Sequence, residues 1–196
     1  MAYDTAGNVT KVTDPRGTTA QTTYTSQYGW DSMRRLVQKT DANGKLYKYT
    51  YNLDGELTKT EAQVGAAWQT TSYSYTPTGQ QATVTDASNQ VTTKSYDALD
   101  RLSVVTDAAG RRSKVVYDSV GQVLKEIRAW AGSNDNCAVP GTLQQCYARS
   151  SYDQNGRKLA VQDANGNITS YLYDGHERLT KATFPDSRPM TPTAIC

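Results

Sequence analysis

The sequence has little of the material from which a thick hydrophobic core is built. Hydrophobic residues make up 37% of the 196 positions, and a single Phe stands against 14 Tyr. This hydrophobic fraction is too low for a core between two layers, which is built mainly from aliphatic side chains. It is sufficient for a single sheet with one tyrosine-rich face. A helical period of 3.6 residues is also missing, so the sequence predicts an all-β protein.

Charge of one sign and long apolar runs are equally scarce. The 21 basic and 19 acidic residues are interspersed and give a net charge of +2, so the sequence predicts no basic patch for nucleic acid. No stretch has the apolar length that spans a bilayer, and residues Met1 to Asp4 show no signal-peptide pattern. We therefore expect neither a nucleic-acid partner nor a membrane span.

What the sequence does have is a repeat. An aromatic residue opens each of eight copies, and four of the seven intervals between these aromatics are 21 residues long. In most copies an apolar residue follows six positions later, and in five copies an Asp follows eleven positions later. The opening residues are Tyr3, Trp30, Tyr51, Tyr75, Tyr96, Tyr117, Tyr152 and Tyr173.

Each copy contains two turn signals. Tyr117 to Gly121 reads Tyr-Asp-x-x-Gly, and Asp107 to Gly110 reads Asp-x-x-Gly. Asp at the first corner accepts hydrogen bonds from backbone N–H groups just downstream, and Gly or Asn three positions later adopts positive φ easily. Thr, Val and Tyr between the turns favour strands. Each copy is therefore predicted to be one antiparallel β-hairpin of about 21 residues, within a continuous, curved, spiralling sheet.

The chain is predicted to be a single repeat array over residues 1–196. Residues 129–146 interrupt the sixth copy as a long loop at a hairpin end, and residues 64–68 form a smaller insertion in the third copy. Residues 187–196 are expected to be a frayed tail. The first copy starts in phase without a cap, as in a segment of a longer array. Open sheet edges of this kind favour self-association.

No catalytic, cofactor or metal site is predicted. Carboxylates recur in every copy, where each is expected to cap its own turn, and they lack the dense cluster of a calcium site. His176 is the only His, lies in a predicted turn, and is tied to no nucleophile by a motif. Arg residues recur one position before the apolar position of the repeat and are expected to pair with turn carboxylates; they are Arg35, Arg101, Arg157 and Arg178.

The tryptophans are the best candidates for a ligand site. Trp30, Trp68 and Trp130 could stack against sugar rings, and the tyrosine rows with nearby Asn, Gln and Thr would complete a surface suited to carbohydrate. The alternative is structural. In that case Trp30 replaces a Tyr of the repeat, while Trp68 and Trp130 cover strand ends beside insertions.

Two of the three cysteines lie in the predicted loop. Cys137 and Cys146 are nine residues apart, and a disulfide between them is expected if the protein is exported, because such bonds persist in oxidising compartments. Free thiols are the alternative. No second pair follows, so the spacing does not match a zinc site. Cys196 is expected to be unpaired.

These motifs resemble the YD, or RHS, repeat. Residues 152–157 (Tyr-Asp-Gln-Asn-Gly-Arg) followed by residues 163–166 (Asp-Ala-Asn-Gly) match it well, and the resemblance extends over all eight copies. The family includes bacterial RHS polymorphic toxins, the B and C components of insecticidal toxin complexes, and teneurins. In these proteins hairpins coil into a hollow shell, which in bacterial members encloses a toxic C-terminal domain. The Asp-Pro autoproteolysis motif of those shells is not matched, because Asp14-Pro15 belongs to a turn of the first copy.

The resemblance implies a non-catalytic structural segment of a partial RHS shell or scaffold that encapsulates or presents a toxin or effector domain. The expected partners are the remaining repeats and the effector domain of a longer RHS protein. The expected location is secreted or at the surface of a bacterium. The alternative function is a module that binds carbohydrate or a cell surface through the Tyr- and Trp-rich sheet.

Overall fold

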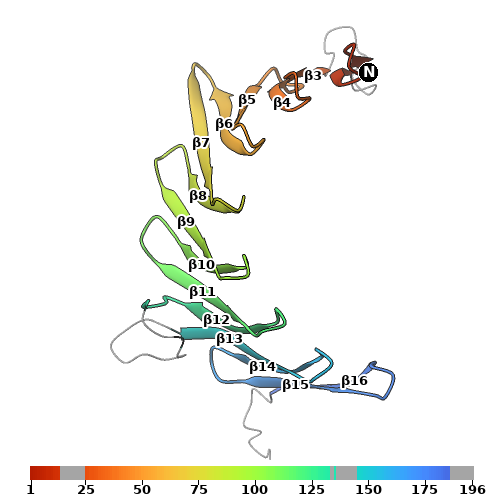
Figure 1. Cartoon of the computed structure of the whole chain (residues 1–196), viewed down its shortest axis with the longest axis vertical. Coiled ribbons are helices and arrows are strands. Elements are labelled where there is room, and N and C mark those ends of the chain that lie inside the picture. Colours follow the sequence, from red (N-terminus) through yellow and green to blue (C-terminus); the bar gives the residue numbers. More distant parts are fainter. Residues whose placement is uncertain (14–24, 133–134, 136–144, 186–196) are drawn as a thin grey trace, which may run out of the picture. The chain divides into compact units, whose positions relative to one another are not determined.

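A computed structural model describes residues 1–13, 25–132, 135 and 145–185. Every regular element within these ranges is a β-strand, and neighbouring strands pair in sequence order from β1 to β16 (Figure 1). The predicted class, all-β with repeated antiparallel hairpins, is confirmed. No helix that could cross a membrane occurs in the described part of the chain.

The chain divides into two compact units, residues 1–94 and 95–196, with the boundary inside β9. The first unit contains β1 (Ala2–Tyr3), β2 (Val9–Thr13), β3 (Thr25–Trp30), β4 (Leu36–Thr40), β5 (Leu46–Tyr51), β6 (Leu57–Val64), β7 (Ala67–Tyr75), β8 (Gln81–Thr85) and most of β9 (Val91–Tyr96). The second contains β10 (Leu102–Thr106), β11 (Arg112–Tyr117), β12 (Val123–Arg128), β13 (Gln145–Tyr152), β14 (Lys158–Asp163), β15 (Ile168–Tyr173) and β16 (Leu179–Thr183). The single array over residues 1–196 stays a prediction.

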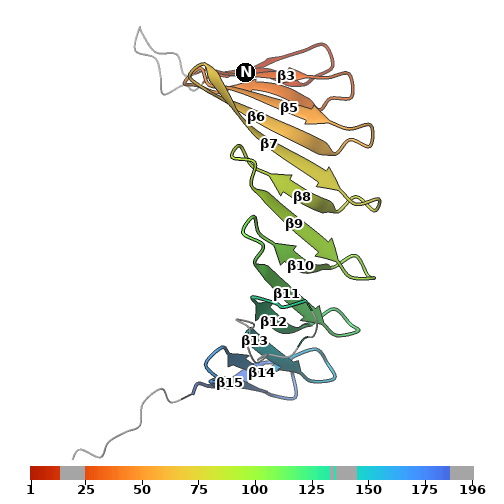
Figure 2. The same cartoon turned by 90° about the vertical axis from the view of Figure 1, so that its left-hand side faces the viewer.

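The two predicted insertions have different outcomes. Most of residues 129–146 and all of the tail 187–196 lie outside the described residues, as does the turn at Asp14. β13 begins at Gln145, so the end of the predicted loop is already strand. The insertion at residues 64–68 is described in full. It lengthens the β6–β7 hairpin to strands of eight and nine residues around a turn at Gly65 (Figure 2).

The Asp-x-x-Gly turns form as the sequence predicts. At Asp97, carboxylate oxygen Oδ1 accepts the backbone N–H groups of Leu99 at 2.9 Å and Arg101 at 3.0 Å. The N–H of Asp100 donates to the carbonyl oxygen of Asp97 at 3.0 Å. The residue three positions after the Asp has positive φ, 76° at Gly110 and 59° even at Asp100. This is a type I turn followed by a left-handed residue, a common hairpin connection.

The hairpins that carry the opening aromatic also contain a β-bulge, which the sequence did not reveal. Gly29 pairs with Gln38, whereas Trp30 pairs with Leu36, so Val37 is extra. The same shift precedes Tyr3, Tyr51, Tyr75, Tyr117, Tyr152 and Tyr173. A bulge bends its strand and increases the local right-handed twist. Each of these seven copies therefore has a local bend next to its aromatic residue.

The described residues contain almost no fully buried apolar core. Only Ile127 and Cys146 are buried hydrophobic residues among them, with exposed fractions of 1% and 8%. Most strand residues are half-buried. Stability must therefore come mainly from contacts between successive hairpins, as in other repeat proteins.

Candidate functional site

The aromatic residue that opens a copy bonds to the backbone of the preceding hairpin. The hydroxyl of Tyr51 donates to the carbonyl oxygen of Leu36 at 2.9 Å, and that of Tyr117 donates to Leu102 at 2.9 Å. Each acceptor is the first residue of a strand. The same contact is made by Tyr75 to Leu57 at 2.7 Å, by Tyr152 to Val123 at 3.0 Å, and by Tyr173 to Lys158 at 3.0 Å. Phe lacks the hydroxyl and could not make this bond.

The Arg that ends the aromatic-containing turn connects that turn to the next copy. Arg101 Nε donates to Asp97 Oδ2 at 2.7 Å, and Nη1 donates to the carbonyl oxygen of Asp118 at 3.0 Å. Its guanidinium carbon lies 4.5 Å from the ring centroid of Tyr117. Arg35 makes the same three contacts. The predicted pairing with turn carboxylates is confirmed, and the link to the next copy adds to it.

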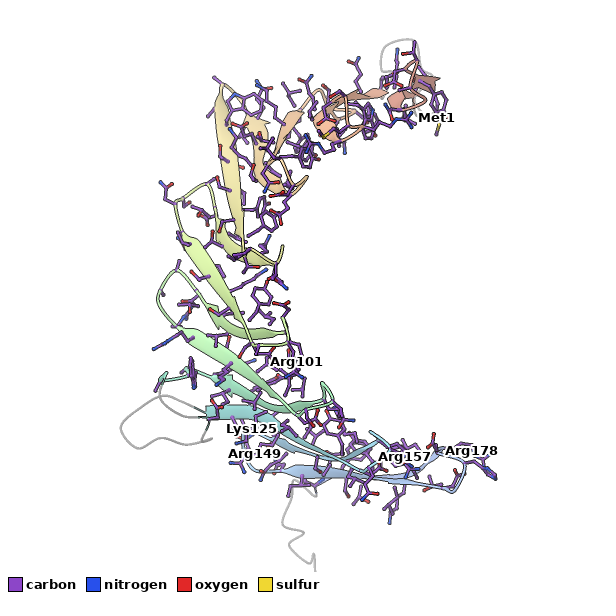
Figure 3. The ribbon with its side chains drawn as sticks, in the orientation of Figure 1. Met1, Arg101, Lys125, Arg149, Arg157 and Arg178 are labelled. Atoms are coloured by element: carbon purple, nitrogen blue, oxygen red, sulfur yellow. The ribbon has the colours of Figure 1, made fainter. Side chains whose placement is uncertain are left out.

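The exposure of these Arg side chains shows how much the next copy covers them. In the second unit, Arg101, Arg157 and Arg178 lie beside turns (Figure 3). The side chains of Arg101 and Arg157 are 26% and 27% exposed, each beneath the Tyr of the following copy. Arg178 keeps its ion pair with Asp174 at 2.8 Å but is 75% exposed. Arg101 and Arg157, which lie against the Tyr of a following copy, are thus much less exposed than Arg178.

Most turn aspartates have a lowered pKa, which favours the ionised form. The backbone N–H of Arg35 is the main cause that lowers the pKa of Asp31 below its ordinary value. For Asp97 the largest single effect is burial, which raises the pKa, but the hydrogen bonds of its turn together outweigh burial and lower it. Burial raises the pKa of the Tyr51 and Tyr75 hydroxyls. These carboxylates therefore act as hydrogen-bond acceptors and these hydroxyls as donors.

The predicted tryptophan sites are dispersed. Trp30 takes the place of a repeat Tyr, since its indole N–H donates to the carbonyl oxygen of Val9 at 2.8 Å. Trp68 lies in β7 under the ammonium of Lys48, 4.5 Å from the ring centroid. Trp130 belongs to the second unit, where Lys114 lies 4.6 Å from its ring. A ligand-stacking role for them stays a prediction, and the structure shows no single surface that the three share within either unit.

The described part of the insertion is bound to the sheet by charge. Asp135 Oδ1 lies 2.7 Å from Lys114 Nζ, and its carbonyl oxygen accepts a hydrogen bond from Lys125 Nζ at 3.1 Å. Lys125 stands opposite Arg149 on the neighbouring strand (Figure 3). Cys146 is a disulfide cysteine. Cys137 lies outside the described residues, so the pairing of these two stays a prediction.

His176 lies exposed in the turn that begins at Asp174, where its backbone N–H donates to Asp174 Oδ1 at 2.9 Å. No group of three or more His, Cys, Asp or Glu side chains arranged to hold a metal ion occurs among the described residues.

A groove of about 470 Å³ lies on the first unit, and sequence reasoning did not find it. Tyrosines, small residues and an acidic turn line it, namely Tyr47, Tyr49, Thr60, Glu61, Ala62, Gln69, Thr71, Asp86, Ala87 and Ser88. The only signal in the sequence was the missing Asp turn of the third copy, because that is where the β6–β7 hairpin is longer.

Comparison with known proteins agrees with this architecture. The chain is similar in fold to the crystal structure of TcdB2-TccC3 with Cdc42 (TM-score 0.71, 17% identity, 94% of this chain and 11% of that chain). It is also similar to TcdB2-TccC3 without its hypervariable C-terminal region (0.70, 16%, 94% and 11%). A third likeness is to the Tc holotoxin pore of Photorhabdus luminescens (0.65, 18%, 83% and 9%).

The chain thus spans about a tenth of the length of these structures. No curated protein sequence matches it. The model of the RHS repeat matches residues 3–46, 75–112 and 152–189, which together make up more than half of the chain. The chain therefore belongs to the RHS repeat family.

Proposed function

We propose that the chain is a structural segment of a β-sheet wall that encloses or presents an effector domain, without catalysis of its own. The observation that carries this proposal is that the residues that define the repeat make the contacts between hairpins. Tyr117 bonds the hairpin before it, and Arg101 joins its own turn to the next one. Residues that would otherwise be candidates for chemistry thus hold hairpin to hairpin.

The partners in this proposal are further RHS repeats and the effector domain that they surround. Likeness in fold to the Tc toxin structures supports the wall. We also propose that the protein is exported by a bacterium. The disulfide at Cys146 supports export, because structural disulfides persist in oxidising compartments.

The test is protease protection of the native protein. The tagged protein is purified under native conditions from the cell that makes it, so that any covalently linked domain or tightly bound polypeptide is purified with it. The purified sample is then digested with a protease. We expect a second domain or polypeptide to resist digestion while the wall is intact. An Arg35→Gln, Arg101→Gln double variant should expose it, because both contacts between copies are lost.

Arg111→Gln is the matched control. Arg111 pairs with its own turn residue Asp107 at 2.7 Å, but its side chain is 80% exposed. The Arg111→Gln variant should leave the protected fragment unchanged. The proposal fails if no second domain or polypeptide accompanies the repeats, or if it is digested equally fast in the wild type and in the double variant.

A further inference from the structure

The groove of the first unit lies where the third copy departs from the repeat. β6 and β7 continue to the turn at Gly65, so their strands have eight and nine residues against six in β5 and five in β8. Tyr49, Thr60 and Thr71 form one row across β5, β6 and β7, since each pairs with the next. Asp86 directly follows β8, the next strand of the sheet, and all four residues line the groove.

Elsewhere in the chain, a turn carboxylate and a Tyr ring together hold an Arg side chain. Arg101 Nε donates to Asp97 Oδ2 at 2.7 Å, and the guanidinium carbon lies 4.5 Å from the ring centroid of Tyr117. Arg35 and Arg157 each make the same pair of contacts, one with a turn Asp and one with a Tyr ring. This combination of groups is therefore the recurring arginine site of the sheet.

Asp86 has a carboxylate oxygen that its turn does not use. Ten turns in the described residues begin with Asp, and in eight of them a side chain donates to Oδ2, in five cases from an Arg four positions later. At Asp86, Oδ1 accepts the N–H groups of Ser88 at 2.8 Å and Gln90 at 2.9 Å. Gln90 stands at the position that Arg occupies in those five turns, and no donor in the described part of the chain reaches Asp86 Oδ2.

The ring of Tyr49 is also uncommitted. Among the residues that the structure describes, no cation lies over this ring and no hydrogen bond involves its hydroxyl. Lys39 and Lys45 lie 5.9 Å and 5.3 Å from the ring centroid of the neighbouring Tyr47. The hydroxyl of Tyr47 donates to Asp41 Oδ2. The groove therefore offers one Tyr ring that the described cations of the chain leave uncovered.

The charge and width of the groove suit a long cationic side chain. Glu61 also lines the groove, but its carboxylate is paired with Lys59 Nζ at 3.2 Å, so the unpaired carboxylate is that of Asp86. Tyr49 and Asp86 stand at the two ends of a row that crosses three inter-strand distances of about 4.8 Å each. Short Thr side chains lie between them, and the groove has a volume of about 470 Å³. A long side chain can reach both the ring and the carboxylate, whereas a small cation reaches only one of them.

We propose that this groove binds an Arg side chain of the polypeptide that the wall encloses or presents, so the identity of the partner rests on the function proposed above. The guanidinium donates to Asp86 Oδ2, and the side chain packs on the Tyr49 ring. Gln69 and Thr71 line the same groove, and their side-chain oxygens can accept the remaining N–H groups. The groove thus makes with another polypeptide the contact that Arg101 makes within this chain.

The test is an NMR titration of the isotope-labelled 196-residue chain with three peptides that differ at one residue. The peptides are acetyl-Gly-Gly-X-Gly-Gly-amide with Arg, Lys or citrulline at X. The Arg peptide should give saturable shifts centred on the amides of Tyr49, Thr71 and Asp86. The citrulline peptide keeps the shape of Arg without its charge and should bind about tenfold more weakly. The Lys peptide should bind about threefold more weakly, because an ammonium lacks the planar fork of a guanidinium.

Two groove variants and two matched controls locate the site. Tyr49→Leu removes the ring and should weaken binding of the Arg peptide about threefold. Asp86→Asn removes the negative charge and should weaken it about tenfold. Outside the groove, Tyr171 stands two residues before its repeat Tyr, as Tyr49 does, and Asp118 is the other turn Asp whose Oδ2 accepts no side-chain donor among the described residues. Tyr171→Leu and Asp118→Asn should bind the Arg peptide as the wild type does.

Three results would overturn the proposal: no saturable shifts with the Arg peptide, equally tight binding of the citrulline or Lys peptide, or an equal loss of binding in the control variants. Protease protection tests the wall separately. A protected polypeptide together with no binding of the Arg peptide would reject the groove alone. Binding of the Arg peptide without any protected polypeptide would reject the wall, and with it the partner named here.

Discussion

Replacing Tyr117 with Phe tests whether the bond between copies stabilises the protein. The change removes one oxygen and keeps the ring. The hydroxyl donates to the half-buried carbonyl of Leu102 at 2.9 Å, and the ring lies 4.5 Å from the Arg101 guanidinium. In Tyr117→Phe the ring contact remains, so the change isolates the hydrogen bond.

The size of the effect follows from that bond. A typical hydrogen bond contributes about 0.5–1.5 kcal/mol net, and a partly buried carbonyl left without a donor adds to the loss. We expect the free energy of unfolding to fall by about 1–2 kcal/mol, and the melting temperature by about 2–8 °C for a chain of this length. Tyr117→Leu, which also removes the cation–π contact, should cost roughly 0.5–1 kcal/mol more.

The assay is guanidinium chloride unfolding followed by far-UV circular dichroism, with a thermal melt as a second measurement. Tyr147→Phe is the matched control, because Tyr147 is 48% exposed and lies against Arg128 rather than against a strand carbonyl. It should leave stability within experimental error of the wild type. If Tyr117→Phe costs no more than Tyr147→Phe, the hydroxyl ladder does not stabilise the array and this reasoning is wrong.

Three further predictions concern the turns and the disulfide. Gly110→Ala should destabilise the protein by about 1 kcal/mol in a thermal melt, because φ at Gly110 is 76°. Gly175→Ala is the control and should not destabilise it. Gly175 also lies in a turn with open space around it, but its φ is not positive. Asp31, Asp97 and Asp107 have lowered pKa values in the folded state. The stability that they contribute is therefore fully present above their unfolded pKa near 4 and is lost as pH falls through the folded values. Denaturation midpoints measured from pH 7 to pH 2 should therefore drop below about pH 4, with a smaller drop in Asp97→Asn, and a flat profile would contradict this. Peptide mapping should identify Cys137 as the partner of Cys146, and reduction should cost about 2–3 kcal/mol, whereas free Cys137 would disprove the pairing.

The turns could be predicted from the sequence because their chemistry is local. Asp97 reaches the backbone N–H groups of Leu99 and Arg101, two and four residues away, and the spacing alone defines that geometry. The pairing of Arg101 with Asp97 is equally local. At residues 64–68 the change in period indicated an insertion, but it could not show that the added residues lengthen the β6–β7 hairpin.

Contacts between copies could not be predicted in the same way. Tyr51 and Leu36 are fifteen residues apart, whereas Tyr152 and Val123 are twenty-nine apart across the insertion, yet both pairs make the same bond. The bulge before seven of the eight opening aromatics changes the pairing register. It recurs at the same position of the repeat and so leaves the period unchanged.

The sequence by itself determined the period, the two turns of each copy, the alternation of the strands and the family resemblance, because each depends on residues only a few positions apart. The tertiary structure alone decided which carbonyl each Tyr hydroxyl meets, which ring each Arg covers, and that the break in the third copy forms a groove. Those contacts depend on how neighbouring hairpins are placed in register. The recurring bulges shift that register without changing the period, and the length of an insertion does not show how its residues pair.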